Sequence, residues 1–164
     1  QGHLADMYFF GEGVEEDLET AFLLNQLAAK QGLARAQFHL GLMYDNGSGV
    51  EEDNISAVRW YLAAAEQGHA GAQRTLGLMY RYGEGVAKEN EEAIKWFRKA
   101  AEQGEADAQY SLSVMILERA DTDVMNKLGI FWMEQAAEHG NAEARELIEE
   151  NRDSLNEPEL LKDT

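Results

Sequence analysis

Apolar residues recur along the chain at steps of three and four positions, and short glycine-containing segments separate the runs. Such spacing places the apolar side chains on one face of an α-helix. The clearest run predicts a helix over residues 34–45, and the Asn-Gly-Ser-Gly segment at 46–49 cannot continue it and is predicted to form a turn. The face of this helix that we expect to be buried carries Ala36, Leu40, Met43 and Tyr44.

A second helix is predicted after the turn, beginning near Asp53 and ending before Gly68. Asp53 offers an N-cap or a first-turn acid, as Asp17 and Glu89 do in neighbouring stretches. Gly68 is expected to be the C′ glycine that ends the helix. No stretch alternates apolar and polar residues as a strand would, so the sequence predicts an all-α protein. The buried face of this second helix is expected to carry Ala57, Trp60, Tyr61 and Ala64.

The helix–turn–helix pattern repeats with a period of 36 residues. Residues 34–69 align with residues 70–105 without gaps and are identical at 19 of 36 positions. The repeat predicts an α/α superhelical solenoid, in which each unit buries its helix faces against its neighbours. The predicted organisation is a single repeat domain, 1–155, and a frayed acidic tail, 156–164. The domain comprises a partial repeat (1–32), three repeats (33–68, 69–104 and 105–140) and a C-terminal capping helix (141–155).

Small residues occupy positions where a helix ordinarily disfavours them. Gly41 and Gly77 lie in the middle of predicted helices, where glycine costs roughly 1 kcal/mol relative to alanine. The aligned positions hold Ala5 and Ser113, which are also small. We therefore expect a neighbouring helix to approach closely there. The alanine pairs 64–65 and 100–101 are expected to do the same on the second helices, with Trp60 and Trp96 filling the wider gaps.

The repeated motif, A-x-A-x-x-x-L-G-x-x-Y-x-x-G-x-G-V…A-x-x-W-x-x-x-A-A-x-x-G, resembles the Sel-one-like repeat (SLR), a relative of the tetratricopeptide repeat. The resemblance covers nearly the whole chain. It implies a right-handed α-superhelix and a role as an adaptor in protein complexes. The third copy carries the motif through Ala70, Ala72, Leu76, Gly77, Tyr80, Gly83, Gly85, Val86, Ala93, Trp96, Ala100, Ala101 and Gly104.

The fourth copy departs from this motif at its turn. It has Arg119-Ala120-Asp121 where the other copies have Gly-x-Gly, and Ile116 where they have tyrosine. We expect its first helix to run longer than those of the other copies and the next helix to start within residues 121–123.

The charge of the chain narrows the classes of partner. Its 31 acidic and 14 basic residues give a net charge of −17, which repels nucleic acid and anionic membranes at long range. No apolar run approaches the length that a membrane-spanning helix needs. The chain has no cysteine, so disulfides, thiol catalysis and thiolate metal sites are excluded. None of these features assigns a cellular compartment.

Two segments resemble motifs of site chemistry and fail the test that each motif sets. The glycine-rich segment 83–88 joins two predicted helices, whereas a phosphate-binding loop follows a strand. The segment beginning at Asp45 has glycines at positions 3 and 5 of a calcium loop, where oxygen ligands are required. The four histidines are not spaced as metal ligands on one helix or turn would be. They are His3, His39, His69 and His139. We predict no catalytic residue, no metal site and no cofactor. Asn46 and Asn54 head formal glycosylation acceptor sequences, and nothing in the sequence decides whether they are used.

Positions that vary between copies while their neighbours stay constant are the candidates for partner binding. On the predicted first helices these positions recur at three- and four-residue steps, and in tetratricopeptide-like solenoids the first helices line a concave groove. The alternative for each residue is that it packs between adjacent units. The candidate partner-binding residues are Arg35, Phe38, Leu42, Asp45, Arg74, Leu78, Arg81, Tyr82, Tyr110 and Val114.

The sequence therefore predicts a non-enzymatic protein-interaction module, an adaptor or scaffold that binds a partner protein or peptide in a concave groove. The expected partner is a protein or peptide, and we expect neither nucleic-acid binding nor insertion into a membrane. The chain is expected to be a monomer, with a weak homo-oligomer as the alternative. Two alternatives from other classes stay open, a hydrolase with an unrecognised active site and a structural self-assembly module.

Overall fold

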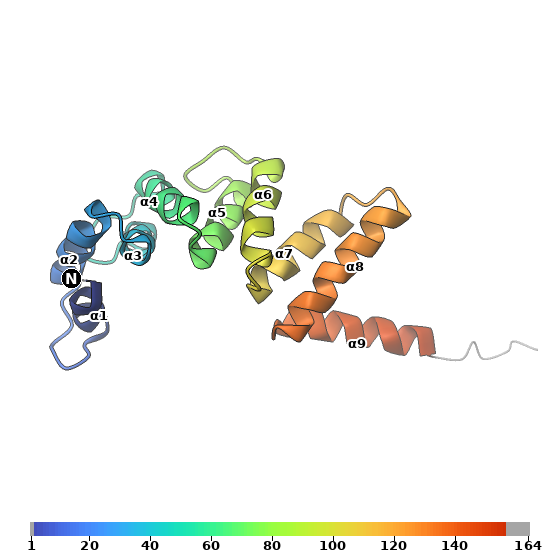
Figure 1. Cartoon of the computed structure of the whole chain (residues 1–164). Coiled ribbons are helices and arrows are strands. Elements are labelled where there is room, and N and C mark those ends of the chain that lie inside the picture. Colours follow the sequence, from blue (N-terminus) through green and yellow to red (C-terminus); the bar gives the residue numbers. More distant parts are fainter. Residues whose placement is uncertain (1, 157–164) are drawn as a thin grey trace, which may run out of the picture. The chain divides into compact units, whose positions relative to one another are not determined.

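The computed structural model describes residues 2–156, and every regular element in this part of the chain is an α-helix (Figure 1). The predicted all-α fold class is confirmed, and the helices form successive helix–turn–helix pairs. Residues 157–164, most of the predicted tail, lie outside the described residues. The helices are α1 (Gly2–Phe10), α2 (Leu18–Lys30), α3 (Ala34–Asn46), α4 (Asn54–Glu66), α5 (Ala70–Tyr82), α6 (Asn90–Ala101), α7 (Ala106–Leu117), α8 (Asp123–Glu138) and α9 (Ala142–Asn156).

The chain divides into two compact units, Gln1–Ala100 and Ala101–Thr164, and each is described by itself. In the first unit α2 packs on α1 and α3, and α4 packs on α3 and α5, so consecutive helices stack along the chain. In the second unit α8 packs along α7, and α9 packs on α8. Neighbour-on-neighbour packing of this kind is the architecture of a repeat solenoid.

The two glycines of the turn between α3 and α4 have different structural roles. Gly47 is the C-cap of α3 in the left-handed conformation, with φ of 66°, and its amide donates to the carbonyl of Met43. Gly49 lies against the start of α2, where a Cβ would collide with the backbone carbonyl of Leu18. In the next turn, Gly85 meets the carbonyl of Asn54 in the same way. The first glycine therefore ends a helix, and the second allows one repeat to contact the backbone of the repeat before it.

The second helices begin at the predicted aspartate caps. The carboxylate of Asp17 accepts a hydrogen bond from the amide of Thr20, and that of Asp53 accepts from the amides of Ile55 and Ser56. These bonds satisfy amides that have no partner within the helix. The hydroxyl of Ser56 also donates to Asp53, and this bond is the main reason that the pKa of Asp53 lies below its ordinary value.

The mid-helix glycines lie against aromatic rings of the second helix in the same repeat. A Cβ at Gly41 would lie 2.7 Å from the Tyr61 ring, and one at Gly77 would lie 2.6 Å from the Phe97 ring. Both rings are fully buried. The expected close approach is therefore present, and its cause is an aromatic ring packed directly against each glycine.

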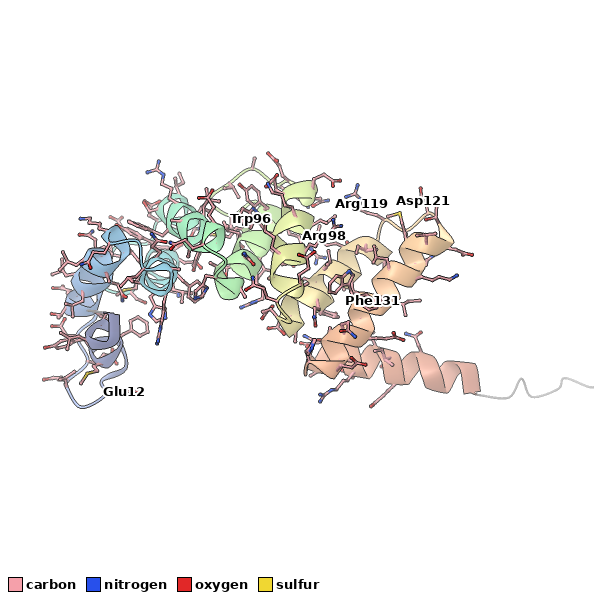
Figure 2. The ribbon with its side chains drawn as sticks, viewed as in Figure 1. Glu12, Trp96, Arg98, Arg119, Asp121 and Phe131 are labelled. Carbon is pink, nitrogen blue, oxygen red and sulfur yellow. The ribbon has the colours of Figure 1, made fainter. Side chains whose placement is uncertain are left out.

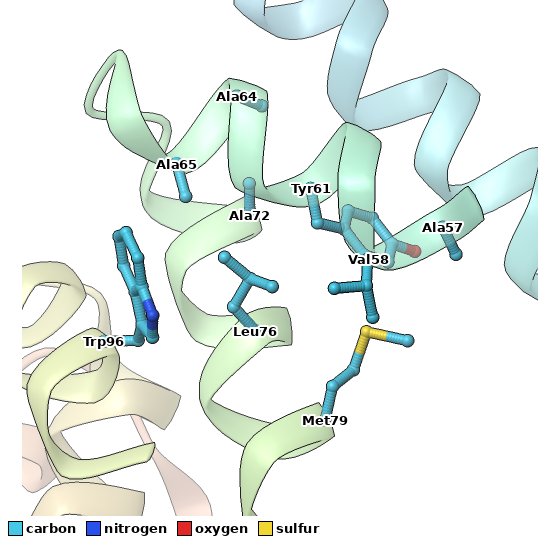
Figure 3. Close-up of a cluster of buried hydrophobic side chains, with 9 residues drawn as sticks. All are labelled: Ala57, Val58, Tyr61, Ala64, Ala65, Ala72, Leu76, Met79 and Trp96. Carbon is cyan, nitrogen blue, oxygen red and sulfur yellow. The ribbon is translucent and has the colours of Figure 1, made fainter. Parts of the chain in front are cut away.

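Two tryptophans of the second helices pack beside the alanine pairs of the preceding repeats. Trp96 is 4% exposed and belongs to the same buried cluster as the Ala64-Ala65 pair of the preceding repeat (Figure 3). Trp60 packs in the same way against a cluster that contains Ala28 and Ala29. The small alanines leave the space that the indole ring of the next repeat fills.

A buried glutamine ties each repeat to the one before it, a contact that the sequence pattern did not single out. Nε2 of Gln37, Gln73 and Gln109 donates to the backbone carbonyl eight residues earlier, at 3.2, 3.0 and 3.0 Å. These carbonyls lie at the ends of second helices, and each also accepts from the amide of the glycine three residues later, Gly32, Gly68 or Gly104. In α9 the aligned residue is Arg145, and its Nε donates to the carbonyl of Ala137 at 2.9 Å. This contact could have been predicted from the glutamine that recurs at the same position of the first helix in three repeats.

The expected extension of the first helix in the fourth copy is wrong. The helix α7 ends at Leu117 and has 12 residues, against 13 in α3 and α5. The extra residues join the second helix, because the Thr122 hydroxyl caps α8 by accepting from the amide of Met125 at 3.3 Å. The predicted start of that helix within residues 121–123 agrees with its first residue, Asp123.

Candidate partner-binding surface

Phe38 and Leu42 on α3 are half-buried and pack against the cluster shared by α4 and α5. The ring of Phe38 lies 5.7 Å from that of Tyr61 and stacks on that of His69 at 4.5 Å. These two residues therefore take part in packing between repeats, which is the alternative that the sequence left open for them. Arg35, one turn before Phe38 on the same helix, is exposed.

Asp45, Tyr61 and Arg74 form an electrostatic group at the other end of α3. The Tyr61 hydroxyl donates to a carboxylate oxygen of Asp45 at 3.1 Å. Burial raises the pKa of Tyr61, the charge and hydrogen bond of Asp45 raise it further, and the charge of Arg74 opposes them. Two of the predicted residues, from different repeats, therefore act on the same buried phenol.

A second group gathers around His69, the N-cap of α5. Its Nδ1 accepts from the amide of Ala72 at 3.2 Å, so this nitrogen carries no proton in the capping state. Burial lowers the pKa of His69, and the charges of His39 and Arg35 lower it further. A neutral ring also suits the N-terminus of a helix, where the helix dipole disfavours positive charge.

The α5 residues of the predicted set lie along one side of that helix. Arg74, Leu78 and Arg81 are half-buried and follow one another at steps of four and three residues. Tyr82 is 61% exposed, and Cζ of Arg81 lies 5.7 Å from the centroid of its ring. The helix thus presents two guanidinium groups and an exposed aromatic ring within two turns.

Tyr110 and Val114 belong to the second compact unit and are described within it. Both are half-buried on α7 and pack, with Leu117, against a cluster formed by Met133, Ala136 and Ala144. Their contacts to α8 and α9 resemble those of Phe38 and Leu42 to α4 and α5. The predicted set therefore divides into apolar residues that are partly committed to packing and residues of α3 and α5 that are charged or exposed, with Leu78 half-buried between the two arginines of α5.

The described residues contain neither a cluster of metal ligands nor a membrane-spanning helix. No group of three or more potential metal-ligating side chains lies together within the described residues. No helix in residues 2–156 combines the length and apolar character needed to cross a bilayer.

The model of the Sel1 repeat matches the chain four times, at residues 1–33, 34–69, 70–105 and 106–141. No curated protein matches the chain. Among solved structures, a Sel1 repeat protein from Oxalobacter formigenes is 33% identical with a TM-score of 0.80, and the match covers 87% of this chain and 58% of that one. A protective antigen of uropathogenic Escherichia coli strains, which displays an SLR fold, is 39% identical with a TM-score of 0.81 and coverages of 87% and 31%.

The cysteine-rich protein B of Helicobacter pylori is 25% identical, with a TM-score of 0.58, and the match covers 65% of this chain and 83% of that one. The present chain has no cysteine, so it lacks the residues for which that protein is named. The chain spans 58% and 31% of the first two structures, so each of those proteins extends well beyond the matched region. Proteins with such repeats generally mediate protein–protein interactions and are generally non-catalytic. Four matched repeats across residues 1–141 place this chain in the Sel1 repeat family.

Proposed function

We propose that this chain is a non-enzymatic adaptor that binds a partner protein or peptide in a concave groove lined by the first helices of its repeats. The proposal rests on aligned positions whose residues differ between repeats while the positions around them keep the same residues. The aligned positions 38, 74 and 110 hold Phe, Arg and Tyr, and the aligned positions 45, 81 and 117 hold Asp, Arg and Leu. The small positions 41 and 77 between them keep glycine and the same ring contact.

The α5 residues have the chemistry that peptide recognition uses. Arg74 and Arg81 can hold a partner's carboxylates or a peptide C-terminus through charge-assisted hydrogen bonds. Leu78 and Tyr82 lie beside them and can accept apolar side chains. Arginine and tyrosine are also the residue types that dominate binding energy at protein interfaces. The competing explanation is that the arginines pair with acids of adjacent units, such as Asp45 or Asp107, and exposed pairs of that kind are worth about 0–1 kcal/mol.

The test is the double variant Arg74→Ala, Arg81→Ala, used as affinity bait with extract of the source cells and mass spectrometry. A matched control is Arg59→Ala, Arg98→Ala, which removes the same charge from exposed arginines on α4 and α6, the latter labelled in Figure 2. Circular dichroism and thermal melting of both variants come first. The expected result is that a partner captured by the wild type and by the control is lost from the α5 variant. Capture by the α5 variant at wild-type affinity rejects the groove and directs attention to the opposite face of the repeats.

A further inference from the structure

The helix α8 has apolar residues on two opposite faces. Gly129, Met133 and Ala136 are buried against its neighbours. Three large side chains on the other face are exposed, and they are Val124 at 75%, Leu128 at 42% and Phe131 at 48%. Steps of four and three residues place these three on one stripe of the helix. We call them the α8 stripe.

The repeat fold does not require apolar residues at these positions. In the third repeat the aligned residues are Lys88, Glu92 and Lys95, and Glu92 forms an ion pair with Lys95 at 2.9 Å. In the second repeat they are Glu52, Ser56 and Arg59. The second and third repeats therefore place polar or charged side chains where the fourth repeat places valine, leucine and phenylalanine, and the first repeat has one apolar residue among the three, Leu23. A contiguous exposed apolar stripe with no structural need for it is typical of an interaction surface.

The charges beside the α8 stripe favour one kind of occupant. Asp123, Glu134 and Glu138 are exposed along its edge, together with one cation, Lys127. Glu118, Arg119 and Asp121 are exposed in the segment before the helix, so acids still outnumber cations beside the stripe, and Figure 2 labels Arg119, Asp121 and Phe131. The chain as a whole carries −17, so a second copy of it is repelled and a partner with basic residues is attracted.

We propose that the α8 stripe is a docking face for a basic amphipathic helix of another protein. Such a helix would set apolar residues, spaced at i, i+3, i+4 and i+7, on Val124, Leu128 and Phe131. Its lysines or arginines would lie over Glu134, Glu138 and the acidic residues at the start of α8. This face is on a second helix of a repeat, so it is separate from the first-helix groove, and either proposal can fail without the other.

The probe is a synthetic 14-residue peptide of leucine and lysine with all leucines on one helical face, labelled for fluorescence anisotropy. The test variant is Val124→Gln, Leu128→Gln, Phe131→Gln, which keeps the net charge of the chain. The matched control is Leu23→Gln, Leu27→Gln, Ile55→Gln, which removes three equally exposed apolar side chains from α2 and α4. Control peptides have the same composition in scrambled order, and the same pattern with glutamate replacing lysine.

The expected result is saturable binding of the basic amphipathic peptide to the wild type and the control variant, weakened at least tenfold in the α8 variant. Circular dichroism should show the three proteins equally helical. The proposal is overturned if the α8 variant binds like the wild type, or if the scrambled or acidic peptide binds equally well. It is also overturned if sedimentation shows a wild-type dimer that the α8 variant abolishes while the peptide does not bind, because a second copy is then the occupant.

A cross-linking experiment on the wild-type protein needs no folded variant. The same basic peptide, carrying a photoreactive benzophenone in place of one leucine, should label residues within 123–138. Labelling concentrated on α2 or α5 instead contradicts the assignment to the α8 stripe.

Discussion

The third and fourth repeats share a 36-residue frame but bring their two helices together in different ways. In the third repeat the first helix carries the glycine, and the Phe97 ring lies on Gly77. In the fourth repeat the aligned residues are Ser113 and Met133, and the hydroxyl of Ser113 donates to the carbonyl of Gly129 at 2.7 Å. In the fourth repeat the glycine lies on the second helix, where Gly129 aligns with Ala93 of the third repeat.

The displaced glycine serves the same purpose from the other side. A Cβ at Gly129 would lie 2.5 Å from the side chain of Leu117 on the first helix. In these two repeats the close packing of the helix pair uses one position without a side chain, and either helix can supply it. The two repeats also differ in their turns, because the fourth lacks the Gly-x-Gly segment and its second helix begins at Asp123, capped by Thr122. The repeat therefore tolerates moving the glycine from one helix to the other, provided that the facing side chain still fills the space.

The largest effect is expected from Gly77→Leu. The new side chain would occupy the space of the buried Phe97 ring, and overpacking of this kind typically costs about 1–3 kcal/mol of unfolding free energy. Urea or thermal unfolding of the variant measures the loss. Phe97→Ala and the double variant complete a thermodynamic cycle, and the double variant should be less destabilised than the sum of the two single changes. A wild-type melting temperature for Gly77→Leu contradicts this account of the glycine.

A smaller effect is expected from Ser113→Ala in the fourth repeat. Here the close contact is a hydrogen bond and not a ring, so the change removes one buried donor and adds no volume, for a loss of about 1 kcal/mol. The measurement is chemical unfolding, with Ser111→Ala on the same helix as the comparison. Equal destabilisation by the two serine variants counts against a special role for the bond to Gly129.

Removal of the cap of α8 tests the difference between the turns. Thr122→Ala should cost about 1 kcal/mol, as is typical for loss of an N-cap, and Thr122→Ser should cost much less because the hydroxyl is kept. Asp53→Ala is the matching change in the second repeat, where glycines shape the turn before the cap. If Thr122→Ala leaves chemical unfolding unchanged, the start of α8 is determined by something other than its cap.

The sequence alone predicted the helices and the repeat because both depend on local spacing. The position of Gly68 as a C′ glycine and of Asp53 as an N-cap follows from backbone chemistry within a few residues. The same local reasoning failed at α7, because whether the chain between Ile116 and Thr122 joins the first or the second helix depends on competition between two ends.

The contacts between different helices could be predicted less well from the sequence. That Gly77 needed to be small could be predicted, but the partner ring of Phe97 could not, because 20 residues of sequence separate them. The glutamine at 73 looked like an ordinary polar position, yet it is buried against the carbonyl of Ala65. The candidate surface residues varied between repeats for two reasons that a single sequence does not separate. Phe38 packs on His69, whereas Tyr82 is exposed.

The smallest effect concerns the N-caps of the first helices, where the third and fourth repeats again differ. His69 caps α5 through Nδ1, whereas the aligned Glu105 caps α7 through a carboxylate oxygen at 2.6 Å from the amide of Ala108. Because the folded protein lowers the pKa of His69 below its ordinary value near 6.5, the unfolded chain binds more protons than the folded one between these two values. The stability that the neutral ring contributes is therefore present above about pH 6.5 and is lost as the pH falls through that value toward the folded pKa.

The variant His69→Asn isolates this contribution, because asparagine is a favoured N-cap and does not titrate. The expected result is that the melting temperature of the wild type falls more between pH 7.5 and pH 5.5 than that of the variant. The other histidines are the same in both proteins, so the difference between the two slopes belongs to His69 and to the charges of Arg35 and His39 beside it. Nuclear magnetic resonance titration of the His69 ring gives an independent check. A pKa at or above the ordinary histidine value, or equal slopes for the two proteins, would contradict this account of the α5 cap.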